Sequence, residues 1–332
     1  MTQNLDSTSA LLLFAAMGAY ALAFISFTLD LARRSAAVGD SAVSGAERIA
    51  AARGRAQGAS GSTVTIERTT YGPGPTDGEK AHREALSLKI GVVLASLGFL
   101  LHLGATILRG VAAARVPWAN MYEFSMTGTL IIMGVFLVAL TRRDLRFLGA
   151  IVTGLVVVML GITSVGFRVD VVPLPPALQS YWLVIHVLVA ILATAFFTMG
   201  FALSLTQLIQ ARRERNAGLS RFRLPGAIPT STALENAAYR VIVVGFVFWT
   251  FTLIAGAIWA EHAWGRYWGW DTKEVWTFII WVIYAGYIHA RATKGWRGSR
   301  SAWLAIIGYS AVLFNFGIVN VFFKGLHAYS GL

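Results

Sequence analysis

Tryptophan is concentrated in one short segment, which reads Trp264-Gly265-Arg266-Tyr267-Trp268-Gly269-Trp270-Asp271-Thr272-Lys273-Glu274-Val275-Trp276. An indole ring offers a broad apolar face at low conformational cost and keeps an N–H for a polar partner. Gly265 and Gly269 allow the backbone to approach a ligand closely. Arg266 and Lys273 can pair with ligand carboxylates. The segment therefore predicts a platform for a large, flat aromatic ligand.

An aromatic belt at a membrane surface is the simpler alternative, because tryptophan prefers the membrane–water boundary. A belt supplies one or two such residues per helix end, whereas this segment has four tryptophans in thirteen positions, Trp264, Trp268, Trp270 and Trp276. We expect Asp271 and Glu274 to cap and start the next helix, because negative charge suits a helix N-terminus.

The residue types also exclude several kinds of chemistry. The chain has no cysteine, which excludes disulfides, iron–sulfur clusters, thiolate metal sites and thiol exchange. No His/Asp/Ser arrangement suggests a covalent intermediate, so we assign no residue as a catalytic acid or base. No glycine-rich phosphate loop follows a strand. The six histidines are the remaining candidates for metal chemistry.

The composition indicates which elements position these residues. Of the 332 residues, 56% are hydrophobic and only 13% are charged, about half the charged share of a soluble protein. So much apolar surface cannot be hidden inside a globule of this size, which excludes a water-soluble enzyme. The formal charge of +12 favours cytoplasmic loops beside anionic lipid rather than nucleic-acid binding.

We expect an all-α polytopic membrane protein with about eight transmembrane helices. A span needs about 20 mostly apolar residues, and eight segments qualify: 10–31, 86–109, 124–141, 146–166, 181–210, 238–260, 275–293 and 301–324. The predicted organisation is a first helix at 1–31, a flexible cytoplasmic loop at 32–85, and a seven-helix core at 86–332. Apart from isolated glycines such as Gly256, the spans look continuous.

Basic residues predict the orientation. With an exterior N-terminus, the loops 32–85, 142–146, 211–223 and 291–300 lie inside and hold 20 Lys and Arg, against six outside. Such a bias marks the cytoplasmic side, so both termini and the tryptophan segment are expected to be exterior.

This topology separates the histidines by depth. His186 and His327 lie near the exterior ends of the fifth and eighth spans, level with the tryptophan segment. His289 is about 14 residues into the seventh span, or some 21 Å deep. A histidine there is costly unless it is paired, and a helix-packing role remains the alternative. His102 is either structural or a ligand, His262 is the main rival to the exterior pair, and His82 is expected to be solvated.

The tryptophan segment resembles the "WWD" signature of haem-handling membrane proteins of cytochrome c maturation, most closely the CcsA/ResC/CcsB family of the two-component (system II) synthase. Thr272 replaces the proline expected between the aspartate and the lysine. The resemblance spans about residues 86–330 and includes Pro117-Trp118 and Asn120-Met121-Tyr122-Glu123-Phe124. It does not specifically cover the first helix or the loop after it.

The resemblance implies a ligand and its contacts. Haem b would be the substrate, with His186 and His327 as exterior axial ligands. Trp264, Trp268, Trp270, Asp271 and Trp276 would form the platform, and Arg266 and Lys273 would contact the propionates. His289 would bind haem during its passage through the membrane, with the second ligand there supplied by a partner protein.

The resemblance also implies a reaction and its partners. The chain would act within a cytochrome c haem-lyase (synthase) complex that attaches haem vinyl groups to the cysteines of an apocytochrome CxxCH segment. A ResB/Ccs1-type membrane protein and exterior thiol–disulfide reductants would be its partners, in the bacterial plasma membrane. A haem transporter without synthase activity and a membrane electron-transfer cytochrome remain the alternatives.

Overall fold

The structure, a computed structural model, describes residues 2–57, 77–174, 179–215, 228–293, 295–323 and 325–326, with side chains described outside 34–57 and 77–85. The helices are α1 (Thr2–Gln57), α2 (Asp77–Ala113), α3 (Met121–Arg142), α4 (Gly149–Gly166), α5 (Tyr181–Arg215), α6 (Ser231–Trp264), α7 (Thr272–Ala292), α8 (Ser299–Phe314) and the short α9 (Asn320–Phe322). These described segments contain no strand, which confirms the predicted fold class.

Seven helices are long and apolar enough to cross a membrane within the described residues. They correspond to seven of the predicted spans. The remaining span, α7, is 21 residues long, so it falls outside this group because of its composition. Apolar side chains on the outer faces support membrane insertion: Leu100, Val158 and Val247 are 63%, 57% and 61% exposed, which is typical of helices that face lipid.

The loop predicted at 32–85 is largely helical wherever the backbone is described. Helix α1 continues to Gln57 and α2 already begins at Asp77. The residues between 35 and 57 are rich in Ala and Arg and contain no proline, and both residue types favour helix. The small number of large apolar residues argues against a packed core there, but it does not exclude an extended helix.

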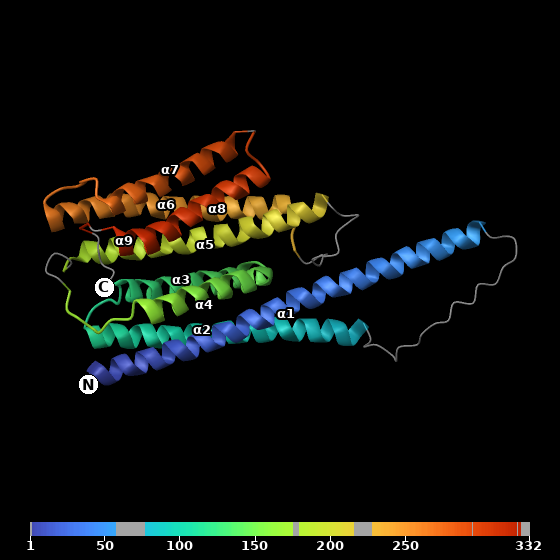
Figure 1. Ribbon diagram of the computed structural model, residues 1–332, viewed down its shortest axis with the longest axis horizontal. Coiled ribbons are helices and arrows are strands. Elements are labelled where there is room, and N and C mark those ends of the chain that lie inside the picture. Colours follow the sequence, from blue (N-terminus) through green and yellow to red (C-terminus); the bar gives the residue numbers. More distant parts are fainter. Residues whose placement is uncertain are drawn as a thin grey trace.

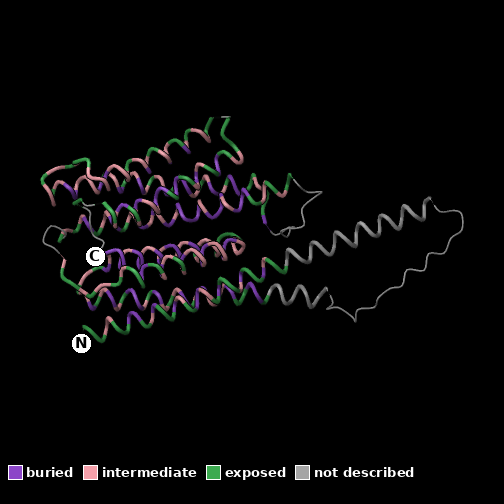
Figure 2. Tube along the Cα trace, in the orientation of Figure 1, coloured by how far each residue is buried: buried purple, intermediate pink, exposed green. Residues whose placement is uncertain are grey.

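The bundle pairs α1 with α2 and α5 with α6, and α3 and α4 lie between these pairs (Figure 1). One apolar core includes Tyr20, Phe136 and Val156 of the first four helices. A second core includes Phe197, Tyr284 and Tyr309 of α5, α7 and α8. Buried residues follow the faces that the helices turn toward one another, and exposed residues follow the outer faces (Figure 2).

The eighth predicted span is one helix over Ser299–Phe322, but its helical geometry changes along its length. After Phe314 the helix widens into a π-helix at Asn315–Val319 before α9 begins. π-Helical turns frequently occur at functional sites, and this one lies at the end of the bundle where α6 connects to α7.

Candidate functional site

The connection between α6 and α7, which we call the tryptophan loop (residues 265–271), is fixed by its own backbone contacts. Gly265 ends α6 in the left-handed conformation (φ 69°) and donates its N–H to the Glu261 carbonyl at 2.8 Å. Glu274 Oε2 accepts the N–H groups of Gly269 and Asp271 at 2.8 and 3.0 Å. Asp271 is the N-cap of α7, so the predicted capping roles of Asp271 and Glu274 are confirmed.

The four tryptophans around this loop point in different directions. Trp264 packs on Trp259 with ring centroids 5.0 Å apart, and Trp276 packs on Phe314 at 4.4 Å. Trp270 is 75% exposed and has a φ of 60°, which is a strained conformation for a bulky residue. Its ring meets that of Trp268 edge-on at 5.9 Å. Of the four, Trp268 lines a cavity.

That cavity has a volume of about 200 Å³ and lies between α3, α5, α6 and the starts of α7 and the π-helix. A single water needs roughly 10–15 Å³ by the same measure, so the cavity has room for an organic ligand. Most of its wall is apolar and includes Ile132, Leu183, Val187, Leu253 and Phe316. The arrangement suits an apolar molecule with a few polar attachment points.

His186 lines this cavity and is held in one orientation. Its Nδ1 lies 3.0 Å from the Thr252 carbonyl oxygen. Because a carbonyl only accepts, Nδ1 must carry the proton, which leaves the lone pair on Nε2. A backbone carbonyl that fixes the tautomer in this way is common behind metal-ligating histidines. The ring also stacks on Trp259 at 6.0 Å and 22°.

A glycine makes this placement of His186 feasible. A Cβ on Gly256 would lie 2.7 Å from His186 Cε1 and 2.9 Å from Nδ1. Any side chain at residue 256 would therefore push the imidazole away from α6. In the sequence, Gly256 is only an isolated glycine within a span, so its role beside His186 could not be predicted from it.

Lys273 reaches the cavity from the first turn of α7. Its Nζ donates to the Asn315 carbonyl at 3.1 Å and to Asn320 Oδ1 at 2.5 Å. Arg266 is arranged differently, because its guanidinium lies over Gly269 and its Nη1 is 3.8 Å from Glu274 Oε1.

The other histidines whose side chains are described, His102, His262 and His289, do not line this cavity. His289 is an exposed residue near the opposite end of α7. His102 is fully buried, with Nδ1 3.4 Å from the Tyr20 hydroxyl. His262 is 56% exposed and lies 3.7 Å from Glu261. The side chain of His82 and all of His327 lie outside the described residues. Gly325, two residues before His327, is in close contact with the Asp271 carboxylate.

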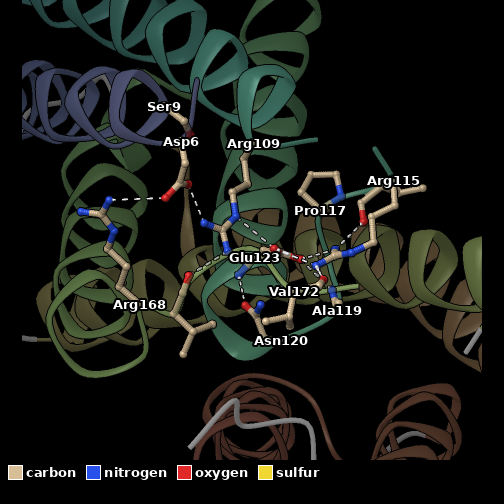
Figure 3. A network of polar contacts seen from close by, with 12 residues as sticks. Asp6, Ser9, Arg109, Arg115, Pro117, Ala119, Asn120, Glu123, Arg168 and Val172 are labelled. Carbon is tan, nitrogen blue, oxygen red and sulfur yellow. Dashed lines mark hydrogen bonds and ion pairs between the residues drawn. The ribbon is translucent and has the colours of Figure 1, made fainter. Parts of the chain in front are cut away.

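A buried charge network, which the sequence did not predict, supports the cavity wall (Figure 3). Glu123 and Arg109 are both 0% exposed and pair at 3.0 Å. Glu123 also pairs with Arg115 at 2.6 Å and accepts the Ala119 N–H at 3.0 Å. Arg109 pairs in turn with Asp6 of α1. The network therefore ties α1, α2 and α3 to residues 118–120, which line the cavity.

A weak sequence signal for this network existed. Arg109 and Glu123 are charged residues at the ends of apolar segments, and charge at such positions usually has a partner. In the sequence, Glu123 stands out only as part of the motif at residues 117–124. Nothing in the spacing of the residues indicated that Asp6, 103 positions before Arg109, would be part of the same network.

Comparison with known proteins places the chain among cytochrome c assembly proteins. The family profile described as "Cytochrome C assembly protein" matches residues 118–327. The "Cytochrome c biogenesis protein CcsA" of Guillardia theta is 35% identical over 258 residues, covering 72% of this chain and 84% of that protein. The protein of the same name from Prochlorococcus marinus is 34% identical over 274 residues, covering 72% and 83%.

A solved structure shares the fold. "Cytochrome c Heme Lyase CcmF" superposes with a TM-score of 0.58 at 16% sequence identity, over 97% of this chain and 50% of that one. The chain thus spans half the length of that larger protein. The matched segment contains the tryptophan loop, His186, Lys273 and Glu123, and the chain belongs to the cytochrome c assembly protein family.

Proposed function

We propose that this protein handles haem in cytochrome c maturation, as a subunit of a cytochrome c synthase. It would hold haem b as its substrate in the cavity beside the tryptophan loop. There it would present the haem vinyl groups for thioether formation with the cysteines of an apocytochrome CxxCH segment. The single observation that carries the proposal is the orientation of His186 in an apolar cavity. Because the Thr252 carbonyl accepts the Nδ1–H of this ring, the lone pair that could bind iron is on Nε2.

The residues that line the cavity suit a porphyrin. Its apolar wall matches the macrocycle, Trp268 offers an aromatic face, and Lys273 supplies a cation for a propionate. A neutral imidazole is a standard axial ligand of haem iron. Orientation alone can contribute several orders of magnitude in rate, so a presenter needs no catalytic acid or base in its own chain.

We propose His327 as the second axial ligand. The contact between Gly325 and Asp271 supports this assignment, because it keeps the chain beside the tryptophan loop just before His327. The predicted platform residues would surround the haem without forming a single flat surface. They are Trp264, Trp270, Asp271 and Trp276. Arg266 remains a candidate for the second propionate.

We propose that His289 binds haem at an earlier point of its passage. Its exposure on α7 supports a ligand shared with a neighbouring membrane protein, for which the ResB/Ccs1 type is the candidate. In this scheme the protein lies in a bacterial plasma membrane with both termini and the tryptophan loop exterior. Apocytochrome c and exterior thiol–disulfide reductants would meet it there.

The test combines a spectrum with a reporter. Wild-type protein, the His186→Ala and His327→Ala variants, and a His262→Ala control are purified with the partner, and their haem spectra are recorded. Covalent haem on a reporter apocytochrome is measured in cells. We expect His186→Ala and His327→Ala to lose the bis-histidine spectrum and the covalent haem, whereas the exposed His262→Ala variant retains both.

The two alternatives give different results. A haem transporter would load haem and leave the reporter without covalent haem in every strain. An electron-transfer cytochrome would keep permanent haem and have no effect on reporter maturation when deleted. A full bis-histidine spectrum in His186→Ala would overturn the ligand assignment.

A further inference from the structure

We propose that Lys273, held by the π-helix, is the centre of a carboxylate-binding subsite that decides which edge of a porphyrin enters the cavity. This inference rests on the proposed function and assigns a specificity role within the same site. The ligand group is a carboxylate on the edge of a planar apolar molecule, and the two Asn residues that bind Lys273 are part of the subsite.

The first observation is how Lys273 is held. Its ammonium donates to the backbone oxygen of Asn315 and to the side-chain oxygen of Asn320. These two residues lie at the start of the π-helix and directly after its end. The two bonds fix the flexible lysine side chain at the cavity wall, so little further ordering is needed when a ligand binds.

The second observation is that no described carboxylate lies within salt-bridge distance of this charge, although Asp271, two residues earlier, interacts with it electrostatically. None of the ion pairs between described side chains involves Lys273. Lys273 also belongs to the first turn of α7, and the helix dipole disfavours a cation at the N-terminus of a helix. A lysine at this position costs stability, and a bound carboxylate would offset that cost.

The third observation is that buried polar groups nearby lack partners. Asn315 Oδ1 and Ser125 Oγ have no hydrogen-bond partner among the described residues. Both residues line the cavity and are only 4% and 1% exposed. Phe124 and Phe316, their neighbours in sequence, stack with centroids 5.2 Å apart, which brings the two segments together. The Ser125 hydroxyl can donate a hydrogen bond to a carboxylate, whereas Asn315 Oδ1 is an acceptor and needs a donor from the ligand or from water.

Arg266 provides an internal contrast. Its guanidinium faces Glu274 Oε1 at 3.8 Å, so its charge already has a counter-ion within the loop. Of the two cations, Lys273 is the one that lines the cavity and has no carboxylate within salt-bridge distance among the described side chains.

The experiment compares two probes on the full-length protein in detergent: haem, and haem with both propionates converted to methyl esters. Binding is followed by the Soret band. A charge-assisted hydrogen bond contributes about 1.5–3 kcal/mol, so we expect the wild type to bind the diester about ten- to a hundredfold more weakly than haem. Lys273→Met should bind the two probes with nearly equal affinity, and Lys273→Arg should restore most of the preference.

Matched variants keep the outcome interpretable. Lys89→Met removes an exposed lysine of α2 and should keep the wild-type preference. Asn320→Leu removes one acceptor of Lys273 and should give an intermediate preference if Lys273→Met does not fold.

Failure of the subsite is distinguishable from failure of the proposed function. A wild type that binds haem and its diester equally overturns the subsite alone, as does a full preference in Lys273→Met. A wild type that binds neither probe overturns the proposed function and the subsite with it.

Discussion

The imidazole of His186 rests on the backbone of α6 at Gly256, where a methyl group would lie 2.7 Å from its Cε1. One turn earlier, the Thr252 carbonyl accepts its Nδ1–H at 3.0 Å. The same stretch of α6 therefore sets both the position and the tautomer of the ring.

Gly256→Ala tests this relationship. Alanine should stabilise the helix by up to about 1 kcal/mol, yet it should displace His186 and lower haem retention at least about tenfold, the equivalent of roughly 1.4 kcal/mol. Thermal melting and haem content of the purified variant measure the two effects. Gly286→Ala, where a Cβ meets nothing within 4 Å, is the control. Unchanged haem content in Gly256→Ala would contradict the positioning role.

Glu123→Ala should be the most destabilising single change near the cavity. It leaves the buried Arg109 and the partly buried Arg115 without their shared partner, and breaking a buried pair costs about 3–5 kcal/mol. Asp144→Asn removes an ion pair whose members are 41% and 63% exposed, which should cost under about 1 kcal/mol. Melting temperatures in detergent compare the two variants, and equal shifts would show that the network adds no more than a surface pair.

Trp270→Gly should stabilise the protein while impairing its function. A bulky residue at φ 60° carries strain of about 1–3 kcal/mol, which glycine relieves, and the exposed ring has little packing to lose. We expect a small rise in melting temperature together with reduced reporter maturation. A fall in melting temperature would show that the Trp268 contact outweighs the strain.

His289→Ala should separate haem passage from haem presentation. Residues 272 and 289 are 17 positions apart on α7, which is about 26 Å along the helix. Haem added to the purified variant should therefore give the wild-type cavity spectrum, whereas the haem content of protein isolated from cells should fall. Loss of the cavity spectrum in the variant would show that the two sites are coupled.

The sequence predicted the fold because hydropathy determines membrane helices directly. Each predicted span has a helix in the structure, and the extra length of α1 follows from residues that favour helix without being apolar. The π-helix could not be predicted, because nothing in the local sequence from Asn315 to Val319 distinguishes it from an ordinary helix.

The sequence also identified several residues of the cavity, but not their arrangement. His186, Trp268 and Lys273 line it together, whereas Trp264 and Trp276 pack against neighbouring aromatic rings. Periodicity gives the depth of a side chain and leaves its direction open, since direction depends on how the helices pack. For the same reason the residues that support the site, Gly256 and Glu123, carried no recognisable signal of their own.

The pairing of Asp6 with Arg109 has a practical consequence for engineering this chain. The first helix lies outside the segment matched by the family profile, which makes it a tempting place to swap in a generic membrane anchor. A replacement without an acid at position 6 would leave the buried guanidinium of Arg109 with one counter-charge fewer. The destabilisation would reach Glu123 of α3, although only the first helix had been changed.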